Sequence, residues 1–313
     1  MSSTQIRAIV DKLLTNVSNQ LVPQGYISEM ILPELRVKQR SGQIGKYGNG
    51  HLRIVSSLVT GKSEYPMVDA VTRSSDNYKV ESHALKSLVT SEDKDNVERP
   101  FDAEQDEVIA LTTLLWLEKE KALADSLGDT AVLTNNVTLA GGDQWSAYTT
   151  SDPCQDLKDG RIAVRGNCGF APNMASMDWD VAETLRFHPN LLDKLGYKDN
   201  RPGGLNDQEL ARAINVKRVN IAEVVYNTSK QGQADSIAPV WGKNLILHHT
   251  PERANLRQKS LGYRVQLISR KPRQVFKSFP DEPVGSTKVM VLDDYDQVLV
   301  DVGCAYLIKD CIA

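Results

Sequence analysis

The chain has 313 residues, of which 41% are hydrophobic and 25% are charged, and its formal net charge is −3. This composition is typical of a globular protein that can bury one large core or two smaller ones. It excludes a membrane-spanning helix, because no run approaches the roughly 18 consecutive apolar residues that such a helix needs. We therefore expect no membrane partner.

The first predicted element is an amphipathic helix over residues 5–21. Apolar residues recur there at helical spacing with polar residues between them, and Pro23 and Gly25 end the pattern. The apolar stripe consists of Ile6, Ile9, Val10, Leu13, Val17 and Leu21. No neighbouring sequence is obviously built to cover this stripe, so we expect an arm that packs on another molecule, with Ile6, Ile9, Leu13 and Val17 in the contact.

A basic, glycine-rich segment follows at residues 36–90, with nine Lys or Arg against four Asp or Glu. Strands are predicted over residues 51–59 and 77–85, and Gly42, Gly45, Gly48 and Gly50 predict a flexible tip. The segment has few large apolar residues, and an isolated two-stranded hairpin is marginally stable in water. We therefore expect a long hairpin that rests on something else.

An acidic segment comes next, because residues 91–129 hold twelve Asp or Glu against four Lys or Arg. Asp102 is a predicted N-cap of a long helix over residues 102–127, which Gly128 ends. Three more acids, Glu104, Asp106 and Glu107, lie in the first turns, where the helix dipole favours negative charge.

The neighbouring blocks of opposite charge suggest that one copy of the chain lies across the next. Complementary charge brings such surfaces together and sets their register. The inter-subunit contacts that we expect are made by Arg36, Lys38, Arg40, Lys46 and Arg53 on the basic side, and by Asp102, Glu104, Asp106 and Glu107 on the acidic side.

The rest of the chain has a mixed α/β pattern. Asp178 and Asn206 are predicted N-caps of two helices, and the acids at 293, 294 and 296 predict a solvated turn between two strands. The predicted strands cover residues 172–177, 216–225, 245–249, 263–268, 289–292, 298–302 and 306–308.

The sequence contains no recognisable catalytic motif, and we expect no metal or cofactor site. Histidines 248 and 249 are adjacent on a predicted strand, so they point to opposite faces and are poorly placed to share a metal. The four cysteines, Cys154, Cys168, Cys304 and Cys311, have no metal-ligand spacing, and we expect them to be reduced thiols in a cytosolic setting.

A second basic cluster at residues 252–277 has eight Lys or Arg against one Glu. It could contact a nucleic-acid backbone, or it could be an ion-paired face that meets the acidic stretch at 281–301 or another subunit. We favour the ion-paired face, because the cluster has little aromatic interleaving for base stacking.

Several short strings occur in a characteristic order along the chain. They are residues 78–86 with Val89 and Ser91-Glu92; Pro100-Phe101-Asp102 with residues 117–120; Pro172-Asn173-Met174 with Trp179, Leu185, His188-Pro189 and Leu195; and Tyr226-Asn227-Thr228, Gly232-Gln233 and Trp241-Gly242-Lys243 before Leu245. Together they make the chain resemble the major capsid proteins of tailed bacteriophages, which have the α+β fold of Hong Kong 97 type.

The resemblance implies names for the parts of the chain. Residues 1–35 would be the N-arm, 36–90 the E-loop hairpin and 91–160 the P-domain with its spine helix. Residues 161–260 would be the mixed α/β A-domain, and 261–313 its end with the return to the P-domain.

The resemblance also implies the function. The protein would be a structural, non-enzymatic subunit that assembles into the hexamers and pentamers of an icosahedral head around double-stranded DNA. Its partners would be copies of itself, a separate scaffolding protein, a portal and a decoration protein, with assembly in the host cytoplasm and a final place in the virion. Some relatives are crosslinked through a Lys–Asn bond. Lys46 and Lys62 lie in the expected E-loop, but no Asn and Glu match them as partners, so a crosslink is not predicted.

Two other interpretations stay open. An encapsulin-like nanocompartment shell would have the same fold around enzyme cargo, and shell size and co-purified DNA would distinguish it. A soluble α/β enzyme would require a pocket with convergent acid and base groups.

Overall fold

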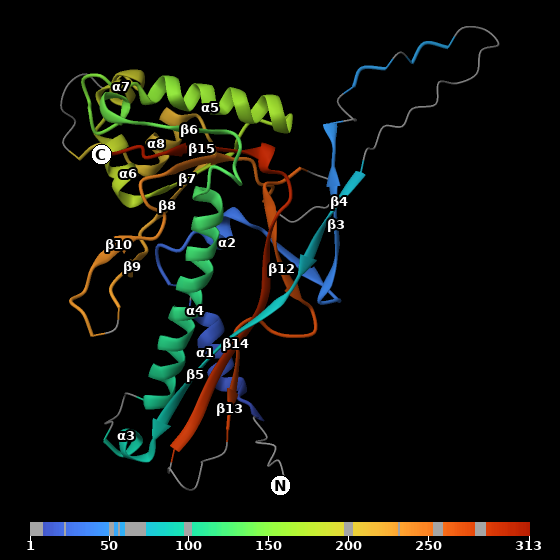
Figure 1. The fold of residues 1–313 in the computed structure, drawn as a ribbon, viewed down its shortest axis with the longest axis vertical. Coiled ribbons are helices and arrows are strands. Elements are labelled where there is room, and N and C mark those ends of the chain that lie inside the picture. Colours follow the sequence, from blue (N-terminus) through green and yellow to red (C-terminus); the bar gives the residue numbers. More distant parts are fainter. Residues whose placement is uncertain are drawn as a thin grey trace.

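The computed structural model describes residues 9–21, 23–49, 53–55, 57–59, 73–96, 102–196, 203–230, 232–252, 259–278 and 286–313. Figure 1 shows an elongated molecule in which a long helix joins two regions. A six-stranded sheet lies along this helix, and a five-stranded sheet with several helices lies at one end of it. A thin hairpin projects from the side of the body.

The six-stranded sheet is organised around β14 (Ser286–Leu299), its longest strand. Along β14 run β5 (Glu81–Thr90), β13 (Gln274–Lys277) and β12 (Gly262–Leu267), all antiparallel to it. The outer strands are β1 (Ile9–Val10), which pairs antiparallel with β13, and β2 (Glu34–Val37), which pairs parallel with β12. Segments from both ends of the chain therefore build this sheet.

The five-stranded sheet has the order β6-β15-β11-β7-β8. Its strands are β6 (Asn136–Thr138), β15 (Ala305–Lys309), β11 (Leu245–His248), β7 (Met174–Asp178) and β8 (Arg218–Ala222). The helices of this region are α5 (Pro153–Cys168), α6 (Trp179–Arg186), α7 (Pro189–Lys194) and α8 (Asp207–Ile214). Their apolar faces pack with the sheet around the buried Trp145 and Met177. The short strands β9 (Val225–Asn227) and β10 (Ile237–Pro239) form a separate hairpin.

The long helix is α4 (Ala103–Gly128), and it confirms the predicted helix with its cap. The Asp102 carboxylate accepts a hydrogen bond from the Glu104 amide at 2.9 Å. Val108 and Leu115 pack under the six-stranded sheet, whereas Leu123 and Leu127 pack in a second cluster with α2 (Ser28–Ile31). The helix therefore joins two parts of the core. A short helix, α3 (Ser91–Asn96), precedes it. No helix within the described residues has the length and apolarity to cross a bilayer.

The N-terminal helix begins later than predicted, as α1 (Lys12–Gln20), because Asp11 caps it and residues 9 and 10 form β1. The side chain that faces the body is Leu14, which was not part of the predicted stripe. Leu14 is 4% exposed and lies in the core, whereas Leu13 is 65% exposed. Polar contacts hold α1 as well, since the hydroxyls of Ser18 and Thr112 lie 2.8 Å apart. The arm therefore packs partly on the rest of its own chain; Ile6 lies outside the described residues.

The projecting hairpin is built from β3 (Ser41–Tyr47) and β4 (Arg73–Lys79). The prediction of a strand over 51–59 was wrong for residues 53–55 and 57–59, and the strand predicted over 77–85 is divided between β4 and β5. Gly42 and Gly45 lie within β3, not in a tip. Gly42 faces Tyr78 across the hairpin, and a Cβ there would come within 2.7 Å of the Tyr78 hydroxyl. Gly50 and Lys62 lie outside the described residues.

The acidic trio does not form a turn. Asp293, Asp294 and Asp296 all lie inside the continuous strand β14. The prediction failed because basic side chains from distant segments neutralise two of these acids: Arg270 pairs with Asp294 at 2.9 Å, and Lys119 lies 4.0 Å from Asp293. Asp296 accepts a hydrogen bond from the Lys79 amide.

The cysteine prediction was wrong for one pair. Cys168, at the end of α5, and Cys304, just before β15, form a disulfide although 136 residues separate them in sequence. The fold brings the two positions together in a buried cluster with Val164, which sequence spacing does not reveal. Cys154 and Cys311 are free thiols.

Candidate assembly surfaces

The base of the β3/β4 hairpin is anchored in the body. Ile44, Tyr78 and Val80 are buried against Tyr263 and Val265 of β12. Beyond this base the hairpin extends away from the molecule (Figure 1). The hairpin is therefore fixed to the body at its base, and just beyond β3 the Asn49 side chain still forms hydrogen bonds with the Asn167 carbonyl and the Lys259 ammonium.

Of the basic residues expected in inter-subunit contacts, two have partners within the subunit. Arg36 pairs with Glu34 at 2.6 Å, and Arg40 lies 3.8 Å from Asp294. Lys38 and Arg53 are exposed, Lys46 is half-buried, and none of the three has an ion pair among the described residues. The structure thus leaves Lys38, Lys46 and Arg53 as the charges free to meet another molecule.

The acidic helix start is also partly neutralised. Glu104 contacts both Lys94 and Lys277, so its charge is satisfied within the subunit. Burial alone would raise the pKa of Glu104, but the hydrogen bonds from the two lysines outweigh burial and lower it. Asp102 and Asp106 remain exposed and Glu107 is half-buried.

A buried group of charges lies beneath the hairpin base. Lys119 of α4 is 2% exposed, and its ammonium lies 3.2 Å from Glu29 and 4.0 Å from Asp293. Glu29 also pairs with Arg264 and Arg273. Burial lowers the pKa of Lys119 to about 8, and Asp293 opposes that shift. The ion pairs of this group connect α2, α4, β12 and β14.

Another buried carboxylate connects the arm to the rest of the molecule. Glu120 of α4 is fully buried and accepts hydrogen bonds from the backbone amides of Ile27 and Ser28, at 2.9 and 3.0 Å. It also accepts from the Trp241 indole at 2.8 Å. A single side chain therefore holds the start of α2 and the loop before β11 against the long helix.

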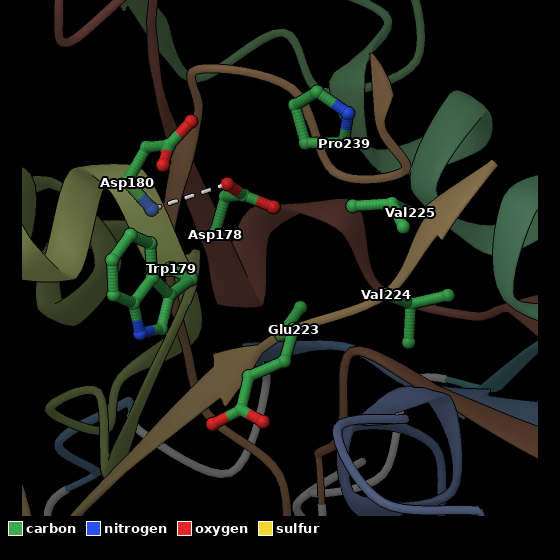
Figure 2. A pocket seen from close by; sticks show the side chains of 8 residues that line it. Asp178, Trp179, Asp180, Glu223, Val224, Val225 and Pro239 are labelled. Carbon is green, nitrogen blue, oxygen red and sulfur yellow. Dashed lines mark hydrogen bonds between the residues drawn. The ribbon is translucent and has the colours of Figure 1, made fainter. Parts of the chain in front are cut away.

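A groove of about 330 Å³ lies where α6, β8 and the β9/β10 hairpin meet. Figure 2 shows Trp179, Val225 and Pro239 around it, together with the carboxylates of Asp178, Asp180 and Glu223. Asp178 is 3% exposed and caps α6 by accepting a hydrogen bond from the Asp180 amide at 3.3 Å. Burial raises the pKa of Asp178 to about 6. The groove is thus apolar on some sides and acidic on others.

Searches against known proteins identify what the chain resembles. No family model matches it. The major capsid protein of Burkholderia phage BcepMu is 25% identical over 250 residues, which cover 78% of this chain and 77% of that protein. A phage-related protein from Bordetella bronchiseptica superposes with a TM-score of 0.75 at 22% identity, over 97% of this chain and 98% of that one.

This chain has the Hong Kong 97-type capsid fold. The capsid structure of cyanophage P-SCSP1u superposes on 89% of this chain and 86% of its own, with a TM-score of 0.58 at 10% identity. An encapsulin complex from Synechococcus elongatus superposes on 93% of this chain and 89% of its own, with a TM-score of 0.53 at 9% identity. The resemblance to tailed-phage major capsid proteins is thereby confirmed.

In this capsid fold the basic cluster at 252–277 contributes mainly to ion pairs within the subunit. Arg270 pairs with Asp294, and Lys259 lies 3.4 Å from Asp301, so two members meet the acidic stretch as expected. Arg264 and Arg273 are buried and pair with Glu29. Residues 253–258 lie outside the described part of the chain. These contacts favour the ion-paired interpretation over contact with a nucleic-acid backbone.

The capsid fold contains two buried histidines that lie beside serines. His248 is 2.9 Å from the Ser176 hydroxyl, and His188 is 3.1 Å from that of Ser151. All four side chains are buried, and burial lowers the pKa of His248 to about 3, so it stays neutral. These pairs therefore satisfy polar groups in the core. No cluster of metal-ligating side chains occurs within the described residues.

The Lys119 group, Glu120 and the groove were not predicted. The only sequence signal for the charge group was the basic excess at 252–277, and its acidic partners come from residues far away in the chain. Glu120 looks like an ordinary charge within a helix. The groove combines residues of β7, α6, β8 and the β9/β10 hairpin, and no signal in the sequence indicated that these segments meet.

The raised pKa of the buried Asp178 carboxyl leads us to expect that the stability of the protein depends on pH. Its pKa is about 6 in the folded protein against an ordinary 3.8, so folding favours the protonated form. The resulting stability is fully present below pH about 4 and is lost as the pH rises through about 6. Asp178→Asn keeps the cap acceptor and should raise the free energy of unfolding by about 1–2 kcal/mol at pH 8, with almost no gain at pH 4. Urea denaturation at both pH values tests this.

The matched control is Asp180→Asn, which changes an exposed carboxylate on the same helix. It should weaken the pH dependence of the wild type only slightly, because the charge of Asp180 contributes less than burial to the raised pKa of Asp178. An equal gain from Asp178→Asn at both pH values would mean that burial of its charge is not the cause.

Proposed function

We propose that this protein is the major subunit of a tailed-phage head. Many copies would form hexamers and pentamers that close into an icosahedral shell around double-stranded DNA. The observation that carries the proposal is the agreement with a phage major capsid protein in sequence and with capsid structures in fold, over most of the chain. The protein would act mechanically and not as an enzyme, assembling in the host cytoplasm and ending in the virion.

The hairpin provides physical support for assembly. Its outer part lies beyond the body of the subunit (Figure 1), and an isolated two-stranded hairpin is only marginally stable in water. A neighbouring copy would cover it. We propose that Lys38, Lys46 and Arg53 provide the positive side of such contacts, with Asp102, Asp106 and Glu107 available on the negative side. In the arm, the exposed Leu13 and the half-buried Val17 would pack on another copy.

Further partners follow from the same role. A shell of this kind would require a separate scaffolding protein and a portal, with a decoration protein on its outer surface. Contact with packaged DNA would be non-specific and made through phosphates, and it would weaken as salt rises.

The test is electron microscopy of the purified protein. We expect closed, hollow shells with icosahedral symmetry, and we expect particles made with the other virion proteins to contain nuclease-resistant double-stranded DNA. A protein that stays monomeric at high concentration in every condition would contradict the proposal.

The second candidate is a nanocompartment shell, which the superposition with an encapsulin favours. Particles of that kind would enclose a protein cargo and no genome-length DNA. The same preparation therefore distinguishes the two, through particle diameter, nucleic-acid content and co-purified protein.

A further inference from the structure

The outermost described part of the hairpin is apolar and uncovered. Ile54 is 102% exposed and Leu58 is 81% exposed, with Val55 at 47% and Val59 at 37%. These four residues lie within one short stretch of the sequence, and exposed apolar side chains that gather in one place mark interaction sites. Arg53, also exposed, adds a positive charge at the start of this segment. We call residues 53–55 and 57–59 the hairpin tip.

The groove of Figure 2 has the complementary chemistry. Trp179 and Val225 are 46% and 53% exposed and provide apolar walls. Asp180 and Glu223 are exposed carboxylates, and no ion pair among the described residues involves them or Asp178. The groove could therefore bind a segment that carries both apolar side chains and a positive charge.

The two surfaces lie on opposite sides of the molecule. Figure 1 shows the β3/β4 hairpin projecting on one side, whereas α6, β8 and the β9/β10 hairpin lie on the other. A contact between unlike patches on opposite sides is heterologous, and it closes into a ring when the rotation between copies permits. Rings of five or six copies are what the proposed function requires.

We propose that the hairpin tip of one subunit docks in the groove of the next, with Ile54 and Leu58 against Trp179 and Val225 and with Arg53 beside Glu223 and Asp180. This inference rests on the proposed function and names the landing site. It also provides a role for the buried carboxylate of Asp178, which the arriving cation would help to stabilise. The acidic start of α4 is the competing landing site.

A charge exchange tests the landing site. Arg53→Glu and Glu223→Arg should each raise the protein concentration needed for assembly by about ten-fold or more, as loss of one favourable contact per interface implies. The double variant should restore assembly. Both side chains are exposed in the subunit, so far-ultraviolet circular dichroism should be unchanged. Sedimentation velocity at several salt concentrations measures the assembled fraction.

The matched control pairs Arg53→Glu with Asp106→Arg at the start of α4, and this combination should not restore assembly. Rescue by Asp106→Arg but not by Glu223→Arg would overturn the groove as the landing site. Assembly that is unaffected by Arg53→Glu and by Ile54→Ser with Leu58→Ser would overturn docking of the tip altogether.

Tryptophan quenching gives a second, independent measurement. Trp116, Trp145 and Trp241 are at most 3% exposed, so Trp179 is the tryptophan that acrylamide can reach. Assembly should protect Trp179 from quenching in the wild type, and Trp179→Phe should remove the difference. In residual assemblies of the Ile54→Ser, Leu58→Ser variant, Trp179 should stay accessible; protection there would contradict the proposal.

The failure of this inference is distinguishable from failure of the proposed function. If the wild-type protein forms no shells at all, the proposed function fails. If the wild type forms shells in which Trp179 remains open to quenching, only the docking site is wrong.

Discussion

Replacing Glu120 by alanine is expected to lower the free energy of unfolding by about 3–5 kcal/mol, because it leaves buried donors without an acceptor. The carboxylate accepts from two amides at the start of α2 and from the Trp241 indole, all within 3.0 Å. Equilibrium urea denaturation followed by circular dichroism measures the change. Weaker protection of α2 from hydrogen exchange should accompany it.

Glu118→Ala is the matched control, since it removes a carboxylate from the same helix, two residues away. The Glu118 side chain is 54% exposed and lies 3.4 Å from His83, an arrangement that contributes about 1 kcal/mol or less. Equal losses for the two variants would show that the hydrogen bonds of Glu120 are not what stabilises this junction.

The second large effect is expected at the disulfide. Replacing Cys168 and Cys304 together by alanine should lower the free energy of unfolding by about 2–5 kcal/mol. The chief reason is that the disulfide closes a long loop and so restricts the unfolded chain, which gains conformational entropy when the bond is removed. Urea denaturation with and without dithiothreitol should give the same loss on reduction of the wild type. The double variant should not respond to the reductant.

Cys154→Ala is the control, because this thiol is free and only half-buried. It should change stability little and preserve the response to dithiothreitol. A wild-type protein whose unfolding is the same in oxidising and reducing buffer would contradict a stabilising role for the Cys168–Cys304 bond.

Elements with local signals were predicted well. The long helix follows from an Asp cap, apolar spacing and a final glycine, all within one stretch of sequence. Asn206 likewise caps α8, in a reciprocal capping box with Glu209. Strands β7, β11, β12 and β15 lie within or close to the ranges predicted as strands at 172–177, 245–249, 263–268 and 306–308. The overall resemblance needed only the order of these elements and a few strings between them.

The failures concern residues whose environment comes from distant parts of the chain. Asp293 and Asp294 look like turn residues until Lys119 and Arg270 neutralise them in the middle of a strand. The burial of Leu14 was not predicted, because only the position of α1 against α4 and β13 places this side chain in the core while Leu13 stays exposed. Cys168 and Cys304 pair for the same reason, across 136 residues.

By itself the sequence determined the class of fold, the long helix with its cap, and the segregation of charge that suggested contact between copies. The long helix and the charge segregation depend on periodicity, capping and composition, which are local, whereas the class of fold followed from the resemblance to capsid proteins. Only the tertiary structure decided which charges are already paired within the subunit and which remain exposed, because ion pairing depends on distance in space. Arg36, Arg40 and Glu104 are paired within the subunit, whereas Arg53 is not. The tertiary structure also brings Trp179 and Glu223 together in one groove.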